Sequence, residues 1–405
     1  MQQLKKAILF TFLAFIMISM ISFNAFASSE NDIGSSSRHV DQLKLIDSKT
    51  IPHNQTYNNT KIGGISGITY NPKSNKWYLL SDDRSEHNPS RFYEANLNYN
   101  HRQLNNINIK NVHTLKQQNG NNYISKKQFN NKSKDVVADP ESIRFDPWTN
   151  NILYTSEGDR SLGLNPFIRF SNLKGDFISE VPISDSLKMD TQTKKGFCNN
   201  LALEGSTFSV DGNSIWTSME APLIQDGPVP TANSGALSRI TQYDRQGNVL
   251  SEYAYPVDSV PYAQDNVKTA ENGVSEILAI NNHEFLTLER ASVQSSDGSF
   301  KNYVRIYKID VNHASDIKNI TALQNSQVTP VKKKLVANLN NEQLDKVDNI
   351  EGMTFGKKLA NGNDSLVIVS NNNFNKSQVS QIIVFEVLNN GSILNRTDIK
   401  ISPVF

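Results

Sequence analysis

A unit the size of a β-hairpin returns five times along this chain of 405 residues. Each copy opens with a short serine- or glutamate-containing motif, continues through an apolar strand, a tight turn and a second strand, and closes on acidic or amide residues. The copies occupy residues 66–84, 141–157, 204–220, 275–290 and 351–373. Internal repetition of this kind predicts that each copy forms one supersecondary unit of a repeat fold.

Turn-forming pairs lie where each hairpin must reverse, and further strands follow each hairpin. The pairs are Asn71-Pro72, Asp146-Pro147, Asp211-Gly212 and Asn281-Asn282. Third strands are expected at 91–95, 168–170, 239–243, 304–308 and 381–385, and fourth strands at 177–183 and 249–255. Short antiparallel strands repeated at intervals of roughly 60 to 75 residues are typical of propeller blades. We therefore predict an all-β fold, a β-propeller with five recognisable blades and five or six blades in total.

A lone strand expected at 41–51 precedes the first copy. This strand could complete the last blade and close the ring, which would remove the two open sheet edges of a linear array. A two-sheet sandwich is the structural alternative, but five copies of one hairpin favour radial repetition.

The first residues carry a leader pattern. Lys5 and Lys6 precede an uncharged apolar run at 7–21, and Ala25-Phe26-Ala27 has the small residues that a signal peptidase requires. We predict a signal peptide at 1–27, a single propeller domain at 28–405, and a protein exported to the periplasm or secreted. A retained membrane anchor is the alternative, because the run is about long enough to span a bilayer.

Charge and cysteine content exclude several classes of protein. The chain has 41 basic and 40 acidic residues, which argues against nucleic acid or an anionic membrane as a partner. Its one cysteine, Cys198, cannot form an internal disulfide. A zinc site is not expected, because the cysteine and histidine residues are too few and too scattered to supply its ligands. We expect a monomer that acts on a small anionic ester or phosphate, with no membrane contact beyond the leader.

Strand direction predicts that charged residues gather at one end of the hairpins. The start of the first strand and the end of the second lie at the same end of an antiparallel pair. The opening acids are Glu141, Glu204, Glu276 and Glu351, and the closing residues include Asp82, Asp83, Glu157, Glu220, Glu289 and Asn371. Crowded carboxylates must be neutralised by a cation, by arginines or by protons.

This pattern predicts a metal and anion site at the mouth of the propeller channel. Oxygen ligands of this kind suit Ca²⁺, and Mg²⁺ less well because it retains more water. The expected metal ligands are Glu141, Glu204, Glu220 and Glu351. Catalytic roles are assigned to Asp82, Asp83 and Glu157, and substrate binding to Arg84, Arg160, Arg239, Arg290 and Arg305. The alternative is a ladder of acids and arginines that only fastens neighbouring blades together.

Several motifs in one order resemble a known family. They are 64–68, 81–84, 91–93, 139–143, 203–205, 288–290, 349–352 and 370–374. Together they resemble the phytase-like domain family, described by esterase-like activity of phytase proteins, over about 62–387. The resemblance implies an exported β-propeller and a hydrolase. Where the family tends to have Asp-Asn, this chain has Asn371-Asn372-Asn373, which removes one anionic ligand.

Three hypotheses of function follow. The first is an exported hydrolase that cleaves phosphate or other esters at a channel mouth lined by metal and arginine. The second is a propeller that binds a ligand or serves as a scaffold, with a structural ion and no turnover. The third is a lactonase-type hydrolase, which would act on cyclic esters.

Overall fold

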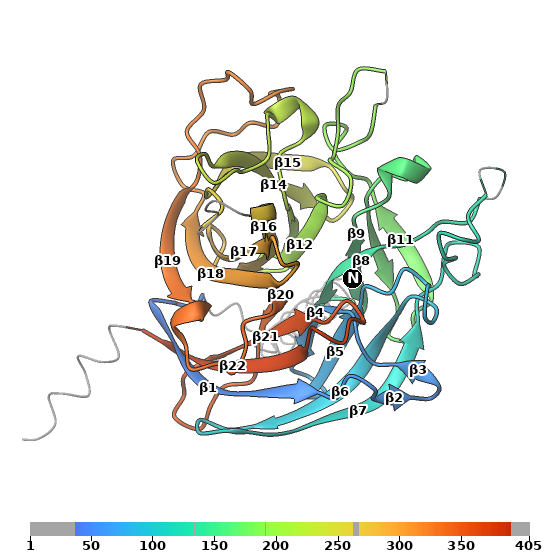
Figure 1. The fold of residues 1–405 in the computed structure, drawn as a ribbon, viewed down its shortest axis with the longest axis vertical. Coiled ribbons are helices and arrows are strands. Elements are labelled where there is room, and N and C mark those ends of the chain that lie inside the picture. The colour runs from blue at the N-terminus through green and yellow to red at the C-terminus, as the bar shows by residue number, and fades with distance from the viewer. Residues whose placement is uncertain (1–36, 131, 133, 191, 262–266, 390–405) are drawn as a thin grey trace, which may run out of the picture. The chain divides into compact units, whose positions relative to one another are not determined.

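Five four-stranded antiparallel sheets surround a common axis in the computed structural model (Figure 1). The structure describes residues 37–130, 132, 134–190, 192–261 and 267–389. The predicted all-β propeller is confirmed, and the number of blades is five. The predicted signal peptide at 1–27 lies outside the described residues. Within them, no helix is long and apolar enough to cross a membrane.

The blades follow one another in sequence, and their strands are numbered along the chain. Blade 1 contains β4 (Ile65–Asn71), β5 (Lys76–Ser81), β6 (Arg91–Tyr99) and β7 (Leu104–Thr114). Blade 2 contains β8 (Pro140–Phe145), β9 (Ile152–Ser156), β10 (Phe167–Ser171) and β11 (Phe177–Val181). Blade 3 contains β12 (Leu203–Phe208), β13 (Ser214–Met219), β14 (Ala236–Asp244) and β15 (Val249–Val257).

Blades 4 and 5 complete the ring. Blade 4 contains β16 (Val267–Ala279), β17 (Glu284–Ser295), β18 (Phe300–Asp310) and β19 (Lys332–Asn338). Blade 5 contains β20 (Asn349–Phe355), β21 (Ser365–Asn371), β22 (Ser380–Leu388) and β1 (Gln42–Ile51). The remaining elements are β2 (Thr56–Tyr57), β3 (Thr60–Lys61) and the 3-10 turns η1 (Arg160–Leu162), η2 (Ile224–Asp226) and η3 (Leu339–Asn341).

The N-terminal strand closes the propeller, as the sequence predicts. Strand β1 pairs antiparallel with β22 from Gln42 opposite Leu388 to Ile51 opposite Ser380. Blade 5 is therefore built from both ends of the domain. Its hydrogen bonds tie the start of the chain to the last blade.

Alternation along each strand explains how the blades pack. In β5, Trp77 and Leu79 join a hydrophobic cluster shared with blade 5, whereas Tyr78 and Leu80 join one shared with blade 2. Successive side chains of a strand point to opposite faces of a sheet, so each apolar strand serves two interfaces. Three further clusters fill the interfaces between blades 2 and 3, 3 and 4, and 4 and 5.

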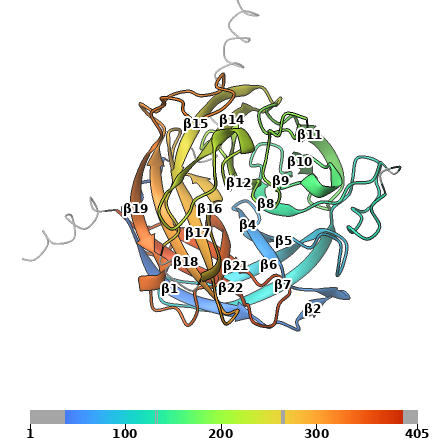
Figure 2. The ribbon, with the colours of Figure 1, turned by 45° about the horizontal axis from the view of Figure 1, so that its top comes forward.

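The strands that open each blade lie nearest the axis (Figure 1 and Figure 2). A buried arginine, Arg144 of β8, connects four of them. Its guanidinium donates to the carbonyl oxygens of Ile68 at 3.0 Å, Ser206 at 2.6 Å and Ile277 at 3.1 Å. It also pairs with Glu276 at 2.7 Å between Nη2 and Oε2. Arg144 thus fastens the inner strands of blades 1 to 4 together on the axis.

Candidate functional site

The inner strand of every blade shifts its pairing register by one residue, near its start in blades 1, 2, 3 and 5 and further along the longer β16 in blade 4. A β-bulge of this kind leaves a residue unpaired and turns its side chain relative to the ladder. In blades 2, 3 and 5 the shift contains a glutamate, and in blades 1 and 4 it contains a serine. We call these positions the inner ring: Ser66, Glu141, Glu204, Ser275 and Glu351.

The second strand of each blade supplies a matching position. In each inner strand, the residue just before the register shift pairs with a residue of the second strand, and the matching position is the next residue along that second strand. We call these positions the outer ring: Asp82, Glu157, Glu220, Arg290 and Asn371. Since the two strands are antiparallel, both rings lie at the same end of the propeller.

Glycines next to the inner ring allow the inner strands to approach closely. A Cβ on Gly352 would lie 2.5 Å from the carbonyl oxygen of Ser66, and a Cβ on Gly205 would lie 2.7 Å from the nitrogen of Ile277. Both contacts are with the backbone of a neighbouring strand, which cannot move aside easily. The repeated Glu-Gly motif therefore combines a cavity-facing acid with a position where only glycine fits.

The rings open into a cavity of about 710 Å³ that we call the central cavity. Three cationic side chains line it, Arg84, Arg290 and Lys346. Nine acids line it as well: Asp82, Asp139, Glu141, Glu157, Glu204, Glu220, Glu271, Asp348 and Glu351. Eight of the predicted site residues are among these lining residues: Asp82, Arg84, Glu141, Glu157, Glu204, Glu220, Arg290 and Glu351. Carboxylates outnumber cationic groups in this cavity by a wide margin.

The two arginines neutralise part of this charge. Arg84 places Nη1 at 3.2 Å from Asp139 and Nη2 at 2.6 Å from Asp159. Arg290 places Nη2 at 3.0 Å from Oε1 of Glu220 and 3.8 Å from Oε1 of Glu351. The two arginines and their acid partners therefore form ion pairs of the kind expected from a ladder of acids and arginines, but these pairs do not account for every acid of the cavity.

An asparagine joins the acids at the seam between blades 1 and 5. The Asn371 side chain donates from Nδ2 to Asp82 at 2.6 Å and to Glu351 at 2.9 Å. A second amide, Asn349, donates to the other oxygen of Glu351 at 2.7 Å. At this seam, neutral amides hold two carboxylates close together.

Glu141 and Glu204 lack such partners. Glu141 is 9% exposed and Glu204 is 6% exposed. Among the residues that the structure describes, neither side chain accepts a hydrogen bond or pairs with a cationic group. A buried carboxylate without a partner is costly as an anion, so it must take up a proton or contact a ligand.

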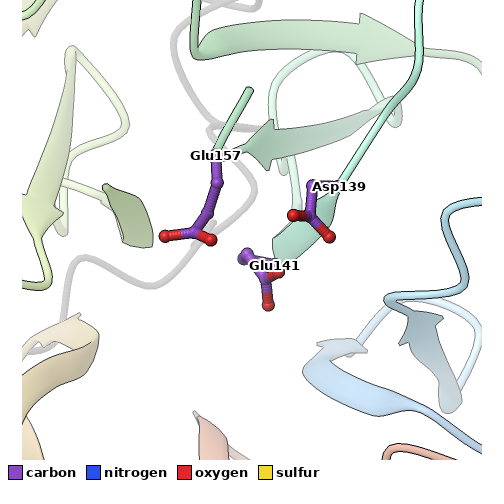
Figure 3. Close-up of side chains that lie close together, drawn as sticks. All are labelled: Asp139, Glu141 and Glu157. Carbon is purple, nitrogen blue, oxygen red and sulfur yellow. The ribbon is translucent and has the colours of Figure 1, made fainter. Parts of the chain in front are cut away.

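The acids form two groups that share Glu157. Oxygens of Asp139, Glu141 and Glu157 lie within 4.8 Å of one another, and so do oxygens of Glu157, Glu204 and Glu220. The first group gathers where β8 begins and β9 ends (Figure 3). Oxygens bound to one Ca²⁺ at 2.3–2.6 Å lie at most about 5 Å apart. The residues present therefore fit a divalent cation, and these buried clusters could bind a metal.

Burial and mutual repulsion raise the pKa values of these acids. Burial raises the pKa of Glu220 to about 8, against the opposing effect of Arg290. Burial likewise raises the pKa of Asp139 to about 6, against Arg84. For Glu157 and Glu204, burial and then neighbouring carboxylates raise the pKa well above its usual range. Without a cation, Glu220 is therefore protonated near neutral pH, and burial favours the neutral forms of Glu157 and Glu204 as well.

Burial also raises the pKa of Asp82 well above its usual range, with Glu351 the next largest cause. The hydrogen bond from Asn371 opposes this rise. Burial therefore favours the neutral form of the Asp82 carboxyl group, which lines the cavity.

Two predicted site residues lie outside the cavity lining, in the loops after β5 and β9. Asp83 accepts from the backbone nitrogens of residues 86–88 and pairs with Arg91 at 2.7 Å. Its oxygens are fully used in holding that turn. Arg160 donates from Nη1 to the carbonyl oxygens of Lys195 and Phe197, both at 3.1 Å. It therefore fastens a loop of blade 2 to the segment before blade 3.

Arg239 also lies outside the cavity lining. Arg239 is buried in blade 3, where Asp226 accepts at 2.6 Å and Glu252 at 2.5 Å. Both ends of its guanidinium are thus held by carboxylates within the blade.

Arg305, on β18, is the fourth predicted residue outside the lining. It lies 3.0 Å from Asp258 and 3.3 Å from Glu289. An arginine in the middle of the third strand of blade 4 is thus engaged by Glu289 of its own blade and by Asp258, which follows the last strand of blade 3, and it does not line the central cavity.

The sequence prediction of the site omitted Asp139 and Glu271, which both line the cavity. Asp139 lies two residues before Glu141, and residues two apart in an extended segment share a face. That spacing was a usable signal. Glu271 had none, because β16 begins at Val267, eight residues before the fourth copy of the repeat begins at residue 275.

Comparison with known proteins gives a family. The model of the family described as Phytase-like, esterase-like activity of phytase, matches residues 60–374. A search of curated proteins finds no match.

Solved structures match this chain only at low identity and with low TM-scores. A mannose phosphorylase from Leishmania mexicana, in complex with a phosphate ion, is 8% identical, with 92% of each chain covered and a TM-score of 0.38. The catalytic domain of an α-L-arabinofuranosidase from Coprinopsis cinerea is 9% identical, with 86% of this chain and 98% of that chain covered and a TM-score of 0.37. A gluconolactonase from Xanthomonas campestris is 10% identical, with 86% and 98% covered and a TM-score of 0.31. Likeness at this level carries no argument about activity.

Proposed function

The chain belongs to the Phytase-like family, described by esterase-like activity of phytase, and from this premise we propose that it hydrolyses phosphate or other esters in the central cavity. The observation that carries the proposal is the presence of two clusters of three acids, which share Glu157, in the cavity that Arg84 and Arg290 also line. Carboxylates alone would repel an anionic ester. Cations held by them, together with arginines, attract it.

We assign the cation to the two carboxylate groups. Glu157, Glu204 and Glu220 would hold one divalent cation, and Asp139 and Glu141 extend the same set of oxygen donors. Ca²⁺ suits an all-oxygen set of this kind best, and Mg²⁺ is the second choice. When bound, such a cation supplies Lewis-acid activation of the ester and of an attacking water.

The remaining residues bind the anion and move a proton. Arg290 and Arg84 would bind the anionic group of the ester. Both lie within 4 Å of cavity carboxylates, and a cation engaging those carboxylates would leave the two guanidinium groups available to the anion. Asp82 would donate a proton to the leaving oxygen, since burial favours its neutral form. Glu351 and Asn371 would hold Asp82 in place.

Turnover assays with and without a cation test the proposal. Metal-stripped protein should hydrolyse 4-nitrophenyl phosphate, 4-nitrophenyl acetate, phytate or a simple lactone only after Ca²⁺ or Mg²⁺ is added. Glu204→Gln should weaken cation binding about 10- to 100-fold, and Asp82→Asn should lower kcat while leaving cation binding intact. The matched control is Glu180→Gln, because that acid pairs with Arg169 on β10 and does not line the cavity.

The assay panel also separates the alternatives. Activity confined to the lactone would support lactonase chemistry. Cation binding without turnover of any ester would support a ligand-binding or scaffold propeller and would overturn the hydrolase proposal.

The expected location and assembly are part of the proposal. We propose that the chain is exported as a monomer, on the strength of the leader pattern that ends at Ala27. N-terminal sequencing of the protein recovered outside the cytoplasm should begin near Ser28. Recovery of the uncleaved chain in the membrane fraction would contradict this and support an anchor.

A further inference from the structure

Blade 4 extends further beyond the rings than the other blades. Strand β16 has 13 residues and β17 has 12, whereas β12 and β13 of blade 3 have 6 each. Past the ring residue Arg290, strands β16, β17 and β18 continue as a three-stranded extension made of residues 267–272, 291–295 and 300–303. We call this extension the blade-4 wall. Its length places side chains above the rings that no other blade supplies.

The two faces of the wall differ in chemistry. One face packs Ala291, Val293 and Tyr303 into a small hydrophobic cluster with Val260. The opposite face lines the central cavity with a polar row, in which Glu271 pairs with Ser292 and Ser292 pairs with Asn302 across the strands. Cross-strand partners share a face, so this row marks the side of the wall that a substrate meets.

The next row on the cavity-facing side contains Phe300. It consists of Thr269, Gln294 and Phe300, which pair directly across the three strands. Phe300 is 63% exposed and lines the central cavity beside Ser299. Exposure increases along β17 from buried Arg290 through half-buried Ser292 and Gln294. The ring of Phe300 therefore lies at the mouth of the cavity, on an otherwise polar face.

We propose that Phe300 contacts an apolar group on the organic part of the substrate, so that the preferred substrate is a monoester of an aryl or alkyl alcohol. This inference rests on the proposed function, because the anionic end of the ester must bind at the rings. With that end at the rings, the rest of the molecule extends toward the mouth. Covering a water-exposed aromatic ring with an apolar group of a ligand makes the free energy of binding more favourable. A polyphosphorylated substrate presents less apolar surface to such a contact.

Binding of two phosphate monoesters tests the inference. Phenyl phosphate and methyl phosphate carry the same charged group and differ in the apolar part. Isothermal titration in the presence of Ca²⁺ should show tighter binding of phenyl phosphate to the unmodified chain. Phe300→Ala should weaken phenyl phosphate binding roughly 3- to 10-fold and leave methyl phosphate unchanged. Phe300→Leu, which keeps an apolar side chain, should retain part of the preference.

A control and two contrary outcomes make the test decisive. Leu335→Ala removes another exposed apolar side chain, from β19 and outside the cavity lining, and should change neither affinity. Equal affinities for the two esters, or a preference that survives Phe300→Ala, would overturn the role of Phe300 alone. Failure of both esters to bind would overturn this inference together with phosphate esters as substrates of the proposed function, whereas turnover of 4-nitrophenyl acetate or the lactone would leave hydrolysis of other esters standing.

Discussion

Arg290 lies 3.0 Å from Glu220 through Nη2 and Oε1, and this buried ion pair joins blade 4 to blade 3 at the central cavity. The same guanidinium lies 3.8 Å from Glu351 of blade 5 and 3.8 Å from Glu271. One cationic side chain therefore balances acids from three blades.

Removing this charge should destabilise the metal-free protein. Arg290→Gln leaves Glu220 and Glu351 buried without their cationic partner, which typically costs about 3–5 kcal/mol in the free energy of unfolding. Urea denaturation in chelator measures the change. The control is Arg160→Gln, which loses hydrogen bonds to two carbonyls and a contact with the Phe197 ring but no ion pair, and should cost about 1 kcal/mol. Equal losses for the two variants would show that Arg290 does not neutralise the cavity.

Stability should fall as pH rises when no divalent cation is present. Glu220 titrates at about 8 in the folded chain against 4.5 for an ordinary glutamate, and Asp139 at about 6 against 3.8. Between these values the folded chain holds more protons than the unfolded chain, so the free energy of unfolding decreases with pH. Thermal unfolding from about pH 5 to about pH 8.5 in metal-free buffer should show a decreasing Tm.

Added Ca²⁺ should reverse most of that decrease, since a bound cation favours the ionised acids. Glu220→Gln should flatten the metal-free profile. A Tm that rises across this pH range without cations would contradict the raised pKa values.

The axial arginine should be a structural residue and not a catalytic one. Arg144→Met leaves Glu276 buried without its partner and removes hydrogen bonds to three blades, so we expect a loss of about 3–5 kcal/mol. The double variant Arg144→Met with Glu276→Gln should recover part of that loss, because the unpaired charge is gone. Cation affinity, measured by titration calorimetry, should be unchanged wherever the variant is folded. A change in affinity without a change in stability would place Arg144 in the site.

The seam between the first and last blades should respond to added charge. Asn371→Asp replaces a donor to Asp82 and Glu351 with a third carboxylate, so we expect the metal-free protein to lose about 2–4 kcal/mol. Ca²⁺ should restore more stability to this variant than to the unmodified chain. Asn121→Asp, at an exposed turn, is the control and should have little effect in either condition. An equal response to Ca²⁺ in both proteins would exclude a cation near the seam.

Much of the fold could be predicted because the repeat is local. Each hairpin reveals itself through alternating apolar residues and a turn, and the pairing of β1 with β22 follows from the need to close the ring. The location of Asp82, Glu157 and Glu220 at the same end of the propeller could be predicted from strand direction alone. These inferences require no knowledge of side-chain contacts.

Blade 4 shows where sequence reasoning failed. Alignment of Glu276 with Glu204 was off by one residue, because the register shift lies at Ser275. A shift of one residue turns a strand side chain to the other face. Glu276 therefore pairs with Arg144 on the axis, and Arg290 takes the cavity position that Glu289 was expected to fill.

The arginines were harder to place than the acids. Arg239 lies in a third strand, as does Arg91, yet its partners Asp226 and Glu252 come from the 3-10 turn η2 and from the fourth strand. Long side chains reach partners that are distant in sequence, and no local pattern reports them. The ion pairs of Arg239 could be known only from the folded structure.

The most direct test of the proposed cation site is the position of a divalent cation in the folded protein. Crystals of the chain soaked in a manganese or terbium salt should give an anomalous peak bounded by the carboxylates of Glu157, Glu204 and Glu220. The peak should disappear in Glu204→Gln, together with cation-dependent turnover of 4-nitrophenyl phosphate. Ester hydrolysis that persists in chelator, with no peak among these three acids, would contradict the account.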